Sequence, residues 1–337
     1  MLSHFKPIRA LRGAVRAAVS GRRGQSPVSA YAFHYERILG TSLELQVAAT
    51  SAGAAQRAEE AVLAEVERLA EVLSGYSETS ELTRWQRQRG VIVPVSPDLA
   101  DVLEAAEAWR IRTGGAFNAA ASSIVDLLHD GAESTRDDIA RQVAMRERAR
   151  AIRRTLWTVD RIRSVACCLT DVSFSLDAIA KGYIVDRAAL SAQRVAGVTQ
   201  VLVNIGGDLR HCGTRPITVG IANPAAPAEN APVIATVRLV NEALATSGGY
   251  RRGFQMDGAF ASHIIDPRTG EPGRRVTSAS VIARDCATAD ALSTAFSVLP
   301  PDESVALADS LPDVGCMMVE QDGTITTNAN WRAHTAS

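Results

Sequence analysis

The most strongly patterned stretch of the chain is AGAAQRAEEAVLAEVERLAEVLS, residues 52–74. That spacing of apolar residues, at three- and four-residue steps, predicts a long amphipathic helix. An apolar helix face of this length must be buried against a second layer of the protein. The residues expected on the core side are Val62, Val66, Leu69, Val72 and Leu73.

The second layer is expected to be a β-sheet. Residues 34–50 read as two strands around Gly40, and a second helix is expected over 98–112. Residues 169–194 look like a strand entering a helix. Because helices and strands do not alternate regularly, the chain is predicted to be α+β, with antiparallel sheet and packed helices in one domain over 31–337. Further strands are expected within 199–210, 215–224, 234–248, 278–284, 314–320 and 324–330.

Composition excludes several other classes of protein. The 337 residues carry a formal net charge of −1 and only 5% aromatic residues, which argues against a nucleic-acid partner. The five cysteines are odd in number and contain no C-x-x-C pair, so buried thiols are expected rather than disulfides or a zinc site. No run of about 18 apolar residues occurs, so no integral membrane segment is expected.

Residues 1–30 differ from the rest, because they contain six lysines and arginines and no acidic residue. We expect a loosely ordered basic leader, with a surface-lying or partner-binding amphipathic helix as the alternative. Charges interrupt the apolar residues, unlike in a secretory signal, and no cysteine is available for a lipid. A cytoplasmic location is therefore expected, or a periplasmic one if the true start lies elsewhere.

A carboxylate and a hydroxyl lie within an apolar, alanine-rich helix expected near the end of the chain. Asp290 and Thr294 are four residues apart and therefore share one helix face. Together with backbone carbonyl and phosphate oxygens they would suit a hard cation such as Mg²⁺. The alternative is that Thr288 or Asp290 caps the helix, and spacing alone favours neither reading.

Other polar motifs are individually weak. The glycines of NIGGDLR, residues 204–210, could leave backbone N–H groups bare to cradle an anion or a flat ring, or could form a hairpin turn. ATSGGY, residues 245–250, repeats this pattern. Lys181 could be a point charge for a phosphate or a solvated lysine, and His263 a ligand contact or a structural histidine. Asp266 to Gly270 form an expected tight turn.

The order of these motifs resembles the ApbE family of FAD:protein FMN transferases, from residue 39 to about residue 300. The resemblance implies a T-fold-related α+β domain. It also implies transfer of the FMN half of FAD, with Mg²⁺, to a Ser or Thr hydroxyl of a target flavoprotein, with release of AMP. Alternatives are an FAD pyrophosphatase and a catalytically weak FAD-binding protein. The matching stretches are GYSETSELTR (75–84), TGGAFNAA (113–120), LDAIAKGYIVDRA (176–188), LVNIGGDLR (202–210), ALATSGGYRR (243–252), HIIDPRTGEP (263–272) and TADALSTAFSVL (288–299).

The resemblance also implies roles for particular residues. The metal ligands would be Asp290, Thr294 and the backbone carbonyl of Ala178, and the catalytic residues would be Asp290, Lys181 and His263. Tyr76 occupies the position of an adenine-stacking aromatic residue, and Leu39 that of a usual methionine. Flavin and pyrophosphate contacts would come from Asp177, Lys181, Gly206, Gly207, Asp208, Thr246, Ser247, Gly248 and His263.

Two positions depart from the family pattern. The acid that the family usually has before Leu176 is replaced by Ser175, and an acid appears two places later as Asp177. We expect Asp177 either to add a carboxylate to the metal site or to act in place of the missing acid. Asn118 stands where the family often has aspartate.

Overall fold

The computed structural model describes residues 28–129, 138–226, 231–248, 253–256, 259–262, 265–273 and 275–335. Most of the expected basic leader and the candidate residue His263 lie outside these ranges. The first strand begins at Ser29, two residues before the expected domain boundary.

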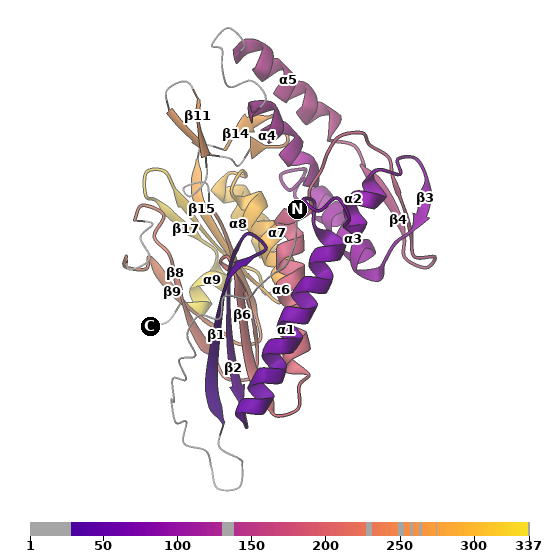
Figure 1. Ribbon diagram of the computed structural model, residues 1–337. Coiled ribbons are helices and arrows are strands. Elements are labelled where there is room, and N and C mark those ends of the chain that lie inside the picture. Colours follow the sequence, from indigo (N-terminus) through magenta and orange to yellow (C-terminus); the bar gives the residue numbers. More distant parts are fainter. Residues whose placement is uncertain are drawn as a thin grey trace.

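One antiparallel sheet of eight strands forms the centre of the molecule (Figure 1). Its strands pair in an order that brings the two ends of the chain into one sheet, so the domain is continuous over the described ranges. The order is β1 (Ser29–Ile38), β2 (Thr41–Ala49), β6 (Val198–Ile205), β7 (Asp208–Cys212), β10 (Ala243–Gly248), β15 (Val276–Ala283), β16 (Gly315–Glu320) and β17 (Ile325–Thr327).

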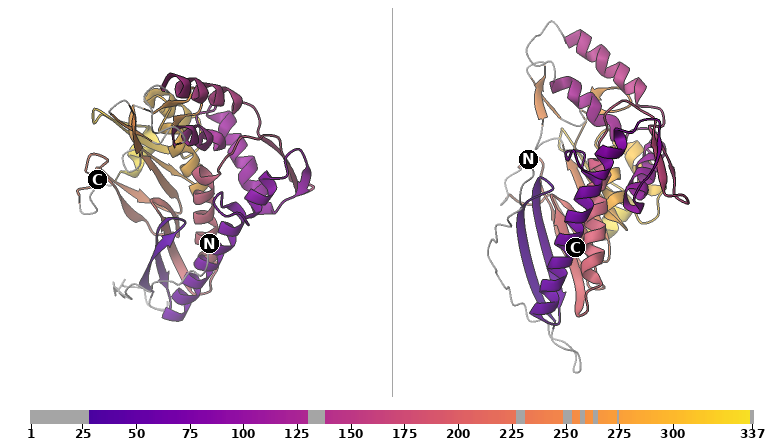
Figure 2. Two further views of the ribbon diagram at one scale, coloured as in Figure 1. Left: turned by 45° about the horizontal axis from the view of Figure 1, so that its top comes forward. Right: turned by 45° about the vertical axis from the view of Figure 1, so that its right-hand side comes forward.

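Helices cover one face of this sheet (Figure 2). The helix layer consists of α1 (Ala52–Leu73), α6 (Asp177–Gln193), α7 (Cys286–Phe296) and α8 (Pro301–Asp309). Alternate residues of β2, from Leu43 to Ala49, point into the larger hydrophobic core beneath these helices. A smaller core on the opposite face lies under β8 (Ile217–Ile221), β9 (Ala235–Leu239) and α9 (Ala329–His334).

The remaining elements lie at the periphery. A small three-stranded sheet projects to one side in Figure 1 with α2 (Glu81–Gln86) and α3 (Pro97–Arg112) beside it. Its strands are β3 (Ile92–Pro94), β5 (Val165–Cys168) and β4 (Trp157–Asp160). The other elements are η1 (Ala119–Ala121), α4 (Ser122–His129), α5 (Asp138–Ala151) and the hairpins β11 (Gly253–Met256)–β12 (Ala259–Ser262) and β13 (Ile265–Asp266)–β14 (Glu271–Pro272).

The predicted fold class is confirmed, and the two expected helices over 52–74 and 98–112 differ from α1 and α3 by one residue at one end. One local expectation is wrong: residues 169–176 form no strand, because β5 ends at Cys168 and the chain is irregular until α6 begins.

All five cysteines are buried and free, as expected. Within the described ranges, no helix has the length and apolar character needed to span a bilayer.

Asn118 has a structural role here. Its Nδ2 donates to the Ile152 carbonyl oxygen at 2.9 Å, and its Oδ1 accepts from the Ala120 N–H at 2.9 Å. An ionised aspartate could accept but not donate, so asparagine is the residue that satisfies both partners.

An ion pair between His334 and Glu242 fastens α9 to the β9–β10 connection. His334 Nε2 lies 3.0 Å from Glu242 Oε1, and this hydrogen bond raises the pKa of His334 above its ordinary 6.5. Burial alone would raise the pKa of Glu242, but the hydrogen bonds from His334 and the Val240 N–H lower it below 4.5. The histidine's contribution to stability is complete below pH 6.5 and is lost as the pH rises through its raised pKa. The glutamate's contribution is present above pH 4.5.

We expect His334→Ala to lower the unfolding free energy by about 1 kcal/mol at pH 6 and by less at pH 8.5, measured by urea unfolding. An equal cost at both values would contradict this.

Candidate active site

The helices α6 and α7 cross in direct backbone contact at Gly182. A Cβ atom at this position would lie 2.3 Å from the Cys286 carbonyl oxygen and 2.8 Å from the Ala287 Cα. The Gly182 N–H donates to Asp290 Oδ2 at 3.1 Å. The absence of a side chain at Gly182 therefore places a carboxylate of α7 against the backbone of α6.

Asp290 lies inside its helix and does not cap it. The helix begins after Asp285, whose side chain accepts a hydrogen bond from the Thr288 N–H at 2.8 Å. The capping interpretation of Thr288 or Asp290 is therefore wrong. Asp290 is only 3% exposed. Burying a carboxylate among apolar side chains costs folding free energy, so Asp290 is a candidate functional residue.

A second buried carboxylate and a lysine complete the centre of the cluster. Lys181 on α6 forms an ion pair with Asp208 Oδ2 at the start of β7, and Asp208 is only 1% exposed. Burial raises the pKa of Asp290 to about 8, the Asp208 charge adds to this increase, and Lys181 opposes it. Burial alone would lower the pKa of Lys181, but Asp208 and Asp290 together raise it, so the amine remains charged.

Hydroxyl groups line the neighbouring end of β10. Ser247 Oγ lies 2.8 Å from Ser293 Oγ and 3.4 Å from Thr294 Oγ1. Thr246 Oγ1 lies 2.8 Å from Ser280 Oγ on β15. The expected pair on one face of α7, Asp290 and Thr294, therefore points toward the ends of β7 and β10.

The double glycine forms the β6–β7 hairpin turn. Its N–H groups are already used, since Gly206 donates to the Ser42 carbonyl oxygen at 3.1 Å and Gly207 donates to Asn204 Oδ1 at 3.0 Å. The expectation of bare N–H groups is therefore wrong, and the hairpin interpretation is correct. Both glycines have positive φ values, 63° and 99°, that favour glycine.

The β1–β2 turn lies beside this hairpin. A Cβ at Gly206 would come within 2.7 Å of Thr41 Cγ2. Leu39, in the same β1–β2 turn, is partly exposed and has a φ of 49°. The structure thus brings Leu39 and the double glycine to the same end of the large sheet as Asp208.

Tyr76 and Asp177 meet at the N-terminal end of α6. Tyr76 is 86% exposed, and its hydroxyl donates to Asp177 Oδ2 at 2.8 Å. The Asp177 charge is among those that raise the pKa of Asp290. Asp177 therefore holds the exposed Tyr76 ring by a hydrogen bond and, through its charge, also acts on the buried Asp290 carboxylate.

The residues present fit a hard cation that has few protein ligands. In the parts of the chain that the structure describes, no three His, Cys, Asp or Glu side chains are grouped to hold a metal ion. The Asp290 carboxylate and the Thr294 hydroxyl offer oxygen atoms from successive turns of α7. Ala178 lies one helical turn before Gly182, whose N–H donates to the Asp290 carboxylate. Such a set leaves coordination positions for the phosphate oxygens of a substrate.

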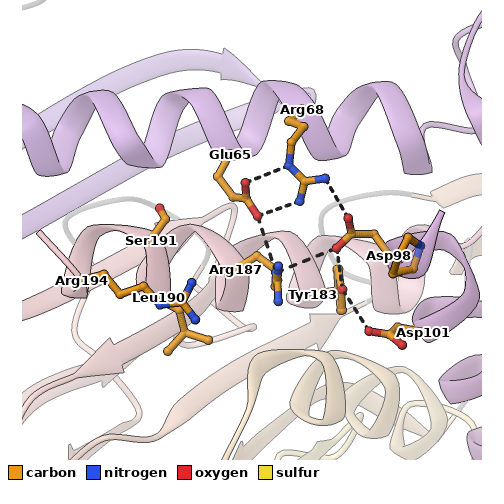
Figure 3. Close-up of a pocket in the computed structure, with 10 residues that line it drawn as sticks. Glu65, Arg68, Asp98, Asp101, Tyr183, Arg187, Leu190, Ser191 and Arg194 are labelled. Carbon is orange, nitrogen blue, oxygen red and sulfur yellow. Dashed lines mark hydrogen bonds and ion pairs between the residues drawn. The ribbon is translucent and has the colours of Figure 1, made fainter.

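A charged cavity of about 420 Å³ lies on another face of α6, between α1 and α3. Figure 3 shows that Glu65, Arg68, Asp98 and Arg187, which line this cavity, are paired with one another. Arg68 on α1 donates to Asp98 on α3 at 2.7 Å and to Glu65 at 2.8 Å, and Tyr183 of α6 donates to Asp98 at 2.8 Å. Arg187 Nε lies 3.5 Å from Glu65 Oε1. These contacts fasten three helices together and have a structural role.

Two further polar residues near the cluster, Ser293 and Asp186, were not among the predicted site residues. Ser293 was not distinguished from other helix residues, although it bonds Ser247. Asp186 accepts hydrogen bonds from the first N–H groups of α7, and the available signal was its position four residues after Gly182, on the same face of α6.

The antiparallel sheet and the helix crossing thus bring a partly buried lysine, two buried carboxylates and several hydroxyl groups to one end of the sheet. A family model, the ApbE family, matches residues 39–318. The chain therefore belongs to the ApbE family, and the resemblance expected from its motifs is confirmed.

Relatives and solved structures agree with this assignment. An FAD:protein FMN transferase of Haemophilus influenzae is 32% identical over 270 residues, which cover 77% of each chain. One of Treponema pallidum is 29% identical over 313 residues, covering 87% of this chain and 86% of that relative. The crystal structure of the ApbE protein of Thermotoga maritima is similar with a TM-score of 0.78 and 26% identity, covering 92% of this chain and 100% of that one. The apo form of Pseudomonas stutzeri flavinyl transferase ApbE has the same fold, with a TM-score of 0.73 and 23% identity over 92% and 98% of the two chains.

Proposed function

We propose that this protein is an FAD:protein FMN transferase. It would transfer the FMN half of FAD to a Ser or Thr hydroxyl of a target flavoprotein and release AMP. The observation that carries this proposal is the Lys181–Asp208–Asp290 cluster. It places the positively charged Lys181 amine near Asp290, a candidate metal ligand, at one end of the sheet. The relatives described above are FAD:protein FMN transferases, which supports the same activity.

The bond changes follow from the substrate's pyrophosphate. The acceptor oxygen bonds to the phosphorus of the FMN half, and the bond from that phosphorus to the bridging oxygen breaks. The bridging oxygen leaves with AMP, and the hydroxyl proton passes to a base or to water. The nucleophile belongs to the partner, so this chain's residues position groups and stabilise charge.

In this proposal Lys181 holds the pyrophosphate, and buried Asp208 orients Lys181. Asp290, Thr294 and the Ala178 carbonyl would hold Mg²⁺, which when bound neutralises charge on the phosphates. Tyr76 would stack on the adenine, and His263 is retained as a candidate catalytic group from the resemblance. The flavin and phosphate contacts would be completed by Leu39, Asp177, Gly206, Gly207, Thr246, Ser247 and Gly248.

The test is to incubate the purified protein with FAD, MgCl₂ and a candidate flavoprotein domain, with EDTA in a parallel reaction. The proposal predicts AMP and covalently bound flavin on the domain, and neither in EDTA. AMP with free FMN and no covalent flavin would identify a pyrophosphatase instead. No AMP under any condition would eliminate both enzymatic functions.

Asp177 provides a separate test at the edge of the site. We propose that its carboxylate supports cation binding in addition to holding Tyr76. Asp177→Ala should then raise the Mg²⁺ concentration for half-maximal AMP release about fivefold, the equivalent of a ~1 kcal/mol interaction.

Tyr76→Phe is the matched control for Asp177→Ala, because it removes the same hydrogen bond and keeps both the ring and the carboxylate. We expect it to leave the Mg²⁺ dependence unchanged. Equal Mg²⁺ dependence of Asp177→Ala and wild type would eliminate the cation role of Asp177.

A further inference from the structure

The N-terminal turn of α7 is held by a side chain from another helix. Asp186 of α6 accepts hydrogen bonds from the Cys286 N–H at 2.8 and 2.9 Å and from the Ala287 N–H at 3.0 Å. These two N–H groups have no partner within α7, because the first N–H groups of any α-helix have none. The third, that of Thr288, is bonded to the helix's own cap, Asp285.

Asp186 is also fixed from its other side. It is 9% exposed, and Arg210 Nε on β7 lies 3.6 Å from its Oδ1. The Arg210 guanidinium in turn donates to the His211 carbonyl oxygen at 2.7 Å and to Asn241 Oδ1 at 3.2 Å. The carboxylate therefore joins α6, α7 and the sheet at one point.

The spacing of the contacts connects Asp186 to the site. Gly182 and Asp186 are four residues apart on α6, and Cys286 and Asp290 are four residues apart on α7, so each pair lies on successive turns of one face. Asp186 bonds Cys286, and Gly182 bonds Asp290. The contact between Asp186 and Cys286 therefore lies one helical turn from the hydrogen bond that holds the Asp290 carboxylate.

We propose that Asp186 is a positioning residue that fixes the axial position and rotation of α7, and thereby the geometry of Asp290 and Thr294 at the pyrophosphate. Its effect on turnover rests on the proposed function, whereas its effect on α7 does not. Asp186 touches neither the substrate nor the cation in this proposal. It acts through the backbone of the helix that carries both ligands.

The test compares three variants in the full chain. Asp186→Ala removes both acceptor oxygens. Asp186→Asn keeps one acceptor oxygen in a side chain of about the same volume. This variant can be tested if the alanine variant does not fold. Asp285→Ala is the matched control, because it removes a cap from the same helix end but leaves the bond between α6 and α7 in place.

We expect Asp186→Ala to raise the Mg²⁺ concentration for half-maximal AMP release at least about tenfold, the scale of losses when a group that orients a metal ligand is removed. Asp186→Asn should recover part of this loss, and Asp285→Ala should stay within about twofold of wild type at saturating FAD. An equal effect of Asp186→Ala and Asp285→Ala would overturn the proposal, since it would reduce Asp186 to a helix cap.

A crystal structure of the Asp186 variant, without substrate, supplies a readout that does not depend on activity. The proposal predicts that the hydrogen bond from Gly182 N to Asp290 Oδ2 is lost or lengthened. If α7 keeps its place and this hydrogen bond persists, the proposal is overturned even if turnover falls. If wild type releases no AMP but α7 moves in the variant, the proposed function fails and the positioning role stands.

Discussion

We expect the replacement of Asp290 with asparagine to abolish measurable AMP release from FAD and to leave the protein folded. Asparagine has the volume of aspartate, and its oxygen can still accept from the Gly182 N–H. It lacks the negative charge that a hard cation requires, so we expect turnover to fall by at least about 10²-fold. AMP release measured over a range of Mg²⁺ concentrations tests this expectation.

Stability of the same variant provides the control. Burial and the charge of Asp208 raise the pKa of Asp290, so the ionised carboxylate destabilises the metal-free fold as the pH rises through that pKa. The asparagine variant should therefore melt no lower than wild type at pH 8 in EDTA. A folded variant with normal turnover would exclude Asp290 from the reaction, and a variant that melts well below wild type would indicate a structural role.

Replacing Gly182 with alanine should cost about 3 kcal/mol of unfolding free energy or more, the upper range for overpacking a tight contact. The new methyl group would lie 2.3 to 2.8 Å from three backbone atoms of Cys286 and Ala287, and backbone cannot rotate away as a side chain can. Helix propensity alone favours alanine over glycine by about 1 kcal/mol, so the two effects have opposite signs. Urea unfolding measures the difference, and AMP release should fall because α7 must shift.

Gly53 in α1 is the matched control for this substitution. A Cβ there would lie 3.6 Å from its nearest neighbour, an Arg57 side-chain atom, which is ordinary contact. Gly53→Ala should therefore be neutral or stabilising by up to about 1 kcal/mol. If both alanine variants were equally stable, the close crossing of α6 and α7 would be contradicted.

Local patterns predicted the local structure well. The apolar spacing over 52–74 indicated α1, and Gly40 and the turn from Asp266 to Gly270 indicated chain reversals. In each case the periodicity or the turn residues act within a few positions of one another. The structure places Lys181, Asp208 and Asp290, which the family motifs named as site residues, close to one another, and their roles in the reaction stay predictions.

Local patterns could not show contacts between distant parts of the chain, or where an element ends. The Gly206 N–H is bonded to Ser42, more than 160 positions earlier, so no local pattern could show that it was occupied. The true cap, Asp285, directly precedes the helix, and it was not among the candidates Thr288 and Asp290 because the sequence does not show that β15 ends at Ala283. Asp186 and Cys286 lie 100 positions apart and meet because Gly182 permits two helices to touch.

The amount of AMP released per covalent FMN is the most direct measurement of the proposed transfer. Wild type, FAD, MgCl₂ and an acceptor flavoprotein domain should yield equimolar AMP and FMN-bearing acceptor by intact mass. The Asp290→Asn variant, or an acceptor whose Ser or Thr is replaced by alanine, should yield no FMN-bearing acceptor. AMP in the absence of covalent FMN, or full transfer by Asp290→Asn, would contradict the proposed function of this site.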